Sequence, residues 1–87
     1  MTSKRTAAFR QQLRSLPPAV RRQAYKAYRQ FKQDPYHPGL QFKHIRGDLY
    51  SVRIGLHFRA LGKRSAEDEI TWFWIGSHAE YDRLLKS

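Results

Sequence analysis

The sequence predicts an α+β domain, in which an N-terminal αα-hairpin packs on one face of a four-stranded antiparallel sheet and a short helix ends the chain. Two observations predict this class. Apolar residues recur with a helical period of 3.6 before residue 34, and with a strand period of two after residue 39. The segment between, 34–39, is rich in proline and glycine, as loops are. Helices followed by a run of strands are typical of α+β folds. The length of 87 residues allows one domain, 1–87.

Two helices are predicted, over residues 7–15 and 19–33. In the first, the apolar residues fall at i, i+4 and i+7 on one face: Phe9, Leu13 and Leu16. Pro17-Pro18 ends it and suits the first turn of the next helix, where no N–H is needed. The second has a wider apolar side opposite a basic one: Val20, Ala24, Ala27, Tyr28 and Phe31. A tight corner between them makes an αα-hairpin.

The strands are predicted from alternation and from the polar turns that separate them. Their expected bounds are 40–45, 49–54, 58–63 and 70–75, with polar turns at 46–48 and 64–68. The last strand, Ile70-Thr71-Trp72-Phe73-Trp74-Ile75, is apolar on both faces, so we expect it in the centre of the sheet. Its aromatic rings are expected in the core rather than on a base-stacking platform. A short helix is predicted over 79–85.

The composition is strongly basic. Lys and Arg number 17 against seven Asp and Glu, for a formal net charge of +10, which favours a polyanion or an acidic protein as partner. The chain has no cysteine, which excludes a disulfide framework and a cysteine zinc site and is typical of a cytoplasmic protein. No apolar run approaches the roughly 20 residues of a membrane span, and no apolar segment follows the first residues, so we expect neither membrane association nor secretion.

The hairpin between the second and third strands has a predictable register. Its apolar faces coincide only if Ile54 lies opposite Phe58 across a three-residue connection that starts at Gly55. Arg53 then lies directly opposite Arg59, on the face away from the core. Because like charges at opposed positions are destabilising, we interpret the pair as the two sides of an anion site. The alternative is that both arginines extend into solvent.

The last strand is followed by a predicted Gly-Ser turn. His78 comes directly after this turn, and Tyr81 follows one helical turn later. An imidazole with an ordinary pKa near ~6.5 suits proton transfer at neutral pH. The alternatives are a histidine that caps the helix or is merely exposed, and a tyrosine that is merely half-buried. His44 and His57 lie among cations and are candidates for contact with a substrate, whereas His37, in the proline-rich loop, is expected to be structural or solvent-facing. The four histidines lack a carboxylate cluster, so neither a metal nor another cofactor is expected.

Several of these segments together resemble the RelE/ParE superfamily of bacterial type II toxins, over nearly all of residues 6–85. The resemblance is carried by Asp34-Pro35-Tyr36-His37-Pro38-Gly39-Leu40, Tyr50-Ser51-Val52-Arg53-Ile54-Gly55, Phe58-Arg59-Ala60-Leu61 and Ile75-Gly76-Ser77-His78. The last is the most specific. There are two departures: Ser51 stands where the best-studied branch has lysine, and only Met1 to Thr6 remain for the first β-strand, which is therefore expected to be short or missing.

The resemblance implies a toxin that arrests growth. Members of the RelE branch are ribosome-dependent endoribonucleases that cut mRNA and so inhibit translation, whereas members of the ParE branch bind DNA gyrase. Matched to the RelE-like pattern, His78, Arg59, Arg53 and Tyr81 are the expected catalytic residues. The expected RNA-binding residues are Lys43, His44, Arg46 and His57, which are basic and lie nearby.

Two other functions remain open at this point: a non-enzymatic toxin that binds gyrase, and a basic nucleic-acid-binding module. The directions of Arg53, Arg59 and His78 discriminate between them, because a shared pocket favours catalysis and divergent side chains favour simple binding. The expected partners are mRNA, the ribosome and an antitoxin. The antitoxin is expected to bring an acidic or partly disordered segment that covers the basic face and fills the edge left by a missing first strand.

Overall fold

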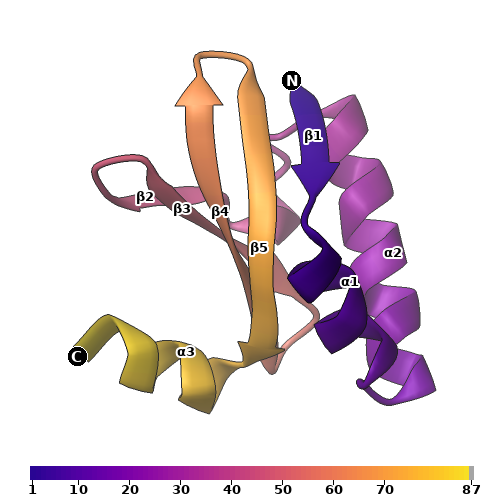
Figure 1. The fold of residues 1–87 in the computed structure, drawn as a ribbon. Coiled ribbons are helices and arrows are strands. Elements are labelled where there is room, and N and C mark those ends of the chain that lie inside the picture. Colours follow the sequence, from indigo (N-terminus) through magenta and orange to yellow (C-terminus); the bar gives the residue numbers. More distant parts are fainter. Residues whose placement is uncertain (87) are drawn as a thin grey trace.

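A five-stranded sheet organises the molecule, with the strand order β1-β5-β4-β3-β2 (Figure 1). The computed structural model describes residues 1–86. Along the chain the elements are β1 (Thr2–Arg5), α1 (Ala7–Arg14), α2 (Pro18–Gln33), the 3₁₀ helix η1 (Pro38–Leu40), β2 (Lys43–Arg46), β3 (Leu49–Ile54), β4 (Phe58–Ala66), β5 (Glu69–Ser77) and α3 (His78–Lys86). All neighbouring strands pair antiparallel except β1, which pairs parallel with β5. The predicted α+β class and element order are confirmed.

The first two helices begin and end close to the predicted bounds. The hydroxyl of Thr6 accepts a hydrogen bond from the Phe9 N–H at 3.0 Å, which satisfies one of the free donors at the start of α1. Pro18 occupies the first position of α2, where its missing N–H costs nothing. No helix among residues 1–86 is long and apolar enough to cross a membrane.

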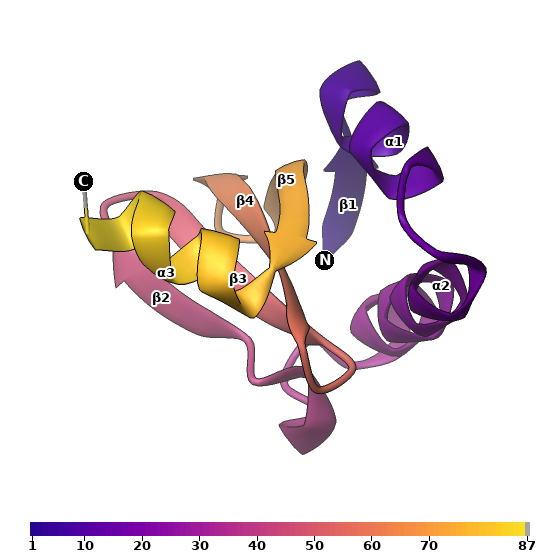
Figure 2. The same ribbon diagram turned by 90° about the horizontal axis from the view of Figure 1, so that it is seen from below.

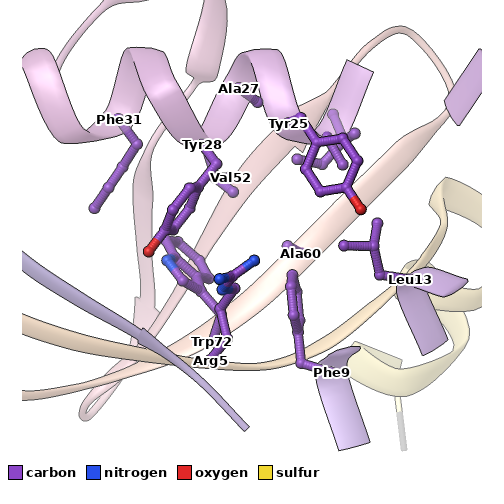
Figure 3. A pocket seen from close by; sticks show the side chains of 12 residues that line it. Arg5, Phe9, Leu13, Tyr25, Ala27, Tyr28, Phe31, Val52, Ala60 and Trp72 are labelled. Atoms are coloured by element: carbon purple, nitrogen blue, oxygen red, sulfur yellow. The ribbon is translucent and has the colours of Figure 1, made fainter. Parts of the chain in front are cut away.

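Helices α1 and α2 cover one face of the sheet and enclose the core with it. Phe31, only 2% exposed, lies at the centre. Its ring meets those of Phe42 and Trp72 edge to face, with centroids 5.2 and 5.3 Å away. The two helices splay apart (Figure 2), and an apolar cavity of about 30 Å³ remains between them and the sheet (Figure 3). Tyr25 and Tyr28 lie on the α2 side of this cavity.

The short first strand is confirmed, and it adds a fifth, parallel strand to the four that were predicted. β1 pairs with β5 from Thr2 opposite Glu69 to Arg5 opposite Trp72. Ser3 ties it to the core, because its hydroxyl accepts from Trp72 Nε1 at 2.9 Å and its carbonyl from the Tyr28 hydroxyl at 3.3 Å. The edge of β5 is therefore occupied, and the expectation of an open edge there is wrong.

Two predicted boundaries shift. The first predicted strand, 40–45, begins only at Lys43, because Leu40 is buried at the end of η1 and Gln41 adopts a left-handed φ of 44°. The predicted turn at 64–68 is mostly strand. β4 and β5 continue their ladder to Ala66 and Glu69, where Ser65 Oγ donates to Glu69 Oε1 at 2.9 Å.

The predicted hairpin register is confirmed. Ile54 lies opposite Phe58 and Arg53 opposite Arg59. Gly55 has a φ of +59°, the left-handed region that glycine adopts without strain. The loop also lies close against α2, because a Cβ on Gly55 would lie 2.5 Å from the Gln23 side-chain oxygen.

Candidate functional site

Helix α3 crosses the face of the sheet that α1 and α2 leave uncovered (Figure 2), and a reciprocal cap fixes its start. Ser77 Oγ accepts from the Glu80 N–H at 3.1 Å, and the Glu80 carboxylate accepts from the Ser77 N–H at 3.0 Å. These hydrogen bonds hold the pKa of Glu80 below its usual value. The His78 N–H donates to the His57 carbonyl at 2.7 Å. The Gly-Ser turn thus places His78 at the first helical position, beside the β3–β4 loop.

Under α3 lies Arg59, a residue of β4 that is 4% exposed. Its Nη2 donates to Ser51 Oγ at 3.0 Å and to the Gln41 carbonyl at 3.3 Å. Its Nε is buried without a hydrogen-bond partner among the residues described. Burial lowers the pKa of Arg59, and its interaction with Tyr81 offsets part of this effect. No carboxylate lies within salt-bridge distance of Arg59 in residues 1–86, so the site holds a fixed cation that lacks an ion-pair partner.

The Tyr81 ring lies between the buried Arg59 and the exposed His78 and contacts both. The Arg59 guanidinium lies 5.1 Å from the centroid of the Tyr81 ring, and the His78 ring centroid lies 5.7 Å from it. The Tyr81 hydroxyl donates to Ser51 Oγ at 3.2 Å. Three of the four predicted catalytic residues therefore form one continuous set, in which the tyrosine ring contacts both of the others.

His78 lies at the rim of this set. Its side chain is 54% exposed, and its Nε2 lies 3.5 Å from Asp82 Oδ2, one helical turn on. This contact is on the Nε2 side of the ring and leaves Nδ1 for contact with a ligand. The imidazole is therefore both accessible and positioned, as proton transfer requires.

Arg53, the fourth predicted catalytic residue, points elsewhere. Its Nε donates to the Gly55 carbonyl at 2.9 Å. The side chain lines a cavity between α2 and the β3–β4 loop, which neither Arg59 nor His78 lines. The two arginines are opposed in register as predicted, but Arg59 is buried under α3 and Arg53 turns toward α2.

The predicted RNA-binding residues divide between the faces of the sheet. Directly opposed residues point to the same side, and Lys43 lies opposite Ser51 and Arg46 opposite Leu49, so both share the face of Arg59. His44 lies opposite Tyr50, on the helix-covered side, with its Nε2 2.8 Å from the Gly47 carbonyl. His57 is exposed in the loop beside His78. Among residues 1–86, no group of three or more His, Asp or Glu side chains could hold a metal ion.

Ser51 and Gln41 were not among the predicted site residues. Ser51 is fully buried and accepts hydrogen bonds from both Arg59 and Tyr81. The predicted register could have identified it, because it alternates onto the same face as Arg53. No sequence signal identifies Gln41, whose carbonyl reaches Arg59 only because the loop takes a left-handed turn there.

The sequence matches a known family, and the fold matches solved structures. Residues 18–83 match the ParE-like toxin domain. The toxin–antitoxin complex RelB–RelE from Methanococcus jannaschii contains a similar chain, at 18% identity and a TM-score of 0.71 over 92% of this chain and 96% of that one. The RelE–RelB complex from Pyrococcus horikoshii OT3 contains another, at 21% identity and a TM-score of 0.72 over 87% and 92%.

The isolated RelE toxin of E. coli has the same fold, at 14% identity and a TM-score of 0.63 over 98% of this chain and 95% of that one. No curated protein sequence matches the chain. Since the family match spans well over half of the sequence, the chain belongs to the ParE-like toxin domain family, within the RelE/ParE superfamily of type II toxins.

Proposed function

We propose that this toxin is a metal-independent endoribonuclease that cuts mRNA on the ribosome and so inhibits translation. The observation that carries the proposal is the set of His78, Tyr81 and Arg59 under and on α3. It combines an accessible imidazole with a desolvated cation that has no carboxylate partner among the residues described. Burying a cation without a counter-ion is costly, and functional sites are one place where proteins keep such a charge.

In this mechanism the RNA 2′-hydroxyl attacks the adjacent phosphorus. His78 accepts the hydroxyl proton at Nδ1, while Asp82 at 3.5 Å stabilises the imidazolium that forms. The new P–O2′ bond gives a 2′,3′-cyclic phosphate. The P–O5′ bond breaks, and the 5′ oxygen leaves as a hydroxyl with a proton from solvent. The fixed charge of Arg59 stabilises the negative charge that builds on the phosphoryl oxygens.

Tyr81 acts as a positioning residue in this scheme, because it is 3% exposed and its hydroxyl already donates to Ser51. Lys43 and Arg46 are exposed on the same face of the sheet and bind the RNA backbone by charge. His57, beside His78, is a further contact for the strand. His44 lies on the opposite face and is left out of the site.

A second candidate is a non-enzymatic toxin that acts by binding DNA gyrase. Two observations favour it. Arg59 Nη1 and Nη2 already donate to Gln41 and Ser51 within the fold, as the terminal nitrogens of a structural arginine do. Arg53 also diverges from Arg59 and His78 rather than sharing a pocket with them. In this case the basic face is a contact surface and His78 has no chemical role.

We also propose that an acidic antitoxin neutralises this toxin by covering its basic face. The similar chains from M. jannaschii and P. horikoshii were each solved with a RelB antitoxin. The net charge of +10 predicts that association weakens as salt rises. Since β1 occupies the edge of β5, a strand contributed by the antitoxin would pair at β2 or β1 instead.

One experiment separates the two functions. The purified toxin is added to ribosomes programmed with a defined mRNA, and new 5′ ends are mapped in a single turnover, without metal beyond that of the ribosome buffer. The same preparation is tested for inhibition of gyrase supercoiling. Cleavage without gyrase inhibition supports the endoribonuclease. Growth arrest and gyrase inhibition without cleavage overturn it in favour of the second candidate.

A further inference from the structure

A second basic site lies away from α3, in a cavity of about 330 Å³ between α2, η1 and the β3–β4 loop. Its polar lining consists of Gln23, Lys26, Gln30, His37 and Arg53, and no carboxylate lines it. We infer that this cavity binds a backbone phosphate of single-stranded RNA. The inference concerns binding alone and holds whether or not the toxin cleaves RNA.

Arg53 supplies the fixed cation of this site. The hydrogen bond from its Nε to the Gly55 carbonyl, 2.9 Å long, holds the guanidinium at the cavity wall. Its two terminal nitrogens are left for a ligand, in the forked arrangement that suits phosphate oxygens. Lys26 adds a second positive charge from α2. Neither residue forms a salt bridge with a carboxylate within residues 1–86.

His37 supplies a further hydrogen-bond donor. Its Nδ1 accepts a hydrogen bond from the Gly39 N–H at 3.1 Å, so the ring proton lies on Nε2, which can donate to a ligand oxygen. The ring lies close over Gly39, since a Cβ at that position would come within 3.3 Å of two ring atoms.

The side-chain amides of Gln23 and Gln30 complete the lining from α2. Gln23 touches the β3–β4 loop, since its side-chain oxygen would lie 2.5 Å from a Cβ on Gly55. Guanidinium, ammonium, imidazole and amide N–H groups all donate hydrogen bonds, and the wall has no anion to repel a ligand. This set suits the non-bridging oxygens of a phosphodiester.

The position of the cavity suits RNA that also reaches α3. Arg53 lies directly opposite Arg59 across the β3–β4 ladder, and the loop that follows Arg53 carries His57, whose carbonyl binds the His78 N–H. One strand of nucleic acid can follow this hairpin from His78 to the cavity. An extended single strand can bend around the loop in this way, whereas a duplex is too stiff to do so.

The test measures binding by NMR, in which inorganic phosphate and then a short single-stranded RNA are titrated into the labelled protein. We expect both ligands to shift the backbone amide resonances of Gly39, Gly55 and Leu56.

Lys26→Gln should weaken RNA binding about threefold to tenfold. It should also reduce the slope of log K against log salt concentration by about one. Arg29→Gln removes one charge from another exposed position of α2, outside the cavity, and should have a smaller effect. His37→Asn keeps an acceptor for Gly39 and should weaken phosphate binding without unfolding the protein.

Equal losses for Lys26→Gln and Arg29→Gln would mean that only overall charge matters, and would overturn the inference. Duplex RNA or duplex DNA that shifts the same amides more strongly than the single strand would also overturn it, as would an acidic peptide that does so. A toxin that fails to cleave mRNA but shows the expected shifts leaves the inference intact.

Discussion

Strands β3 and β4 present two different faces, and each face is stabilised in a different way. Toward α1 and α2 they contribute Val52, Ile54 and Ala60 to an apolar core. Toward α3 they contribute Ser51 and Arg59, which are equally buried but depend on hydrogen bonds. The apolar face tolerates small shifts, because dispersion and burial are not directional. The polar face depends on particular atoms, because a lost partner leaves a buried donor unsatisfied.

The largest expected effect is on chemistry at the polar face. His78→Gln should lower the single-turnover rate of mRNA cleavage by roughly 10²–10⁴, the usual contribution of general acid–base catalysis. The unfolding temperature should barely change, because the side chain is 54% exposed. His44→Gln is the matched control, since His44 lies on the other face of the sheet. If His78→Gln cleaves as fast as wild type, the proton-transfer role is wrong.

On the apolar face, the largest loss of stability is expected from a substitution at Phe31. Phe31→Ala should lower the free energy of unfolding by about 3–5 kcal/mol, because the ring is 2% exposed and contacts two other rings. Urea denaturation measures this loss. Tyr36→Ala removes an aromatic ring that is 67% exposed and should cost less than about 1 kcal/mol. A loss below about 0.5 kcal/mol for Phe31→Ala would contradict the assigned core.

A smaller change tests the directional bonds of the polar face. Ser51→Ala removes the acceptor shared by Arg59 and Tyr81 and should cost about 1–3 kcal/mol of unfolding free energy, because the Tyr81 hydroxyl then loses its acceptor and Arg59 Nη2 keeps only the Gln41 carbonyl. Ser65→Ala, at an exposed position of β4, should cost less than about 0.5 kcal/mol. The two variants are compared by thermal unfolding. Equal losses of unfolding free energy in the two variants would show that the buried Ser51 hydroxyl contributes no more to stability than an exposed one.

The smallest expected effect is pH-dependent and lies at the cap of α3. The folded protein lowers the pKa of Glu80 from an ordinary value of 4.5. The carboxylate therefore contributes stability above that pH, and the contribution is lost as the pH falls through the lower, folded pKa. Glu80→Gln should lower the unfolding temperature slightly at pH 7 and have no effect at the lowest pH at which the protein stays folded. An equal effect at both pH values would contradict a role for the charge.

The apolar face could be predicted from the sequence because burial leaves a periodic pattern. That pattern also determined the hairpin register and hence the opposition of Arg53 and Arg59, which the structure confirms. β1 could not be predicted with its pairing, since Thr2-Ser3-Lys4-Arg5 has no apolar alternation and pairs mainly through its backbone.

The polar site was predicted only in part, because its bonds depend on atoms rather than on periodicity. His78, Tyr81 and Arg59 were expected together and lie together. The direction of Arg53 depends on a hydrogen bond to the loop, which no residue pattern encodes. Ser51 looked like a departure from the family, yet it joins Arg59 to Tyr81.

The parallel pairing of β1 with β5 has a consequence for the order in which the protein acquires its structure during synthesis. The first strand leaves the ribosome early, but its neighbour, Glu69–Ser77, is made much later. Such distant contacts slow folding, since a long loop must close before they can form. The helix that carries His78 and Tyr81 is made later still. The sheet and the candidate site can therefore be completed only after β5 and α3 have been made.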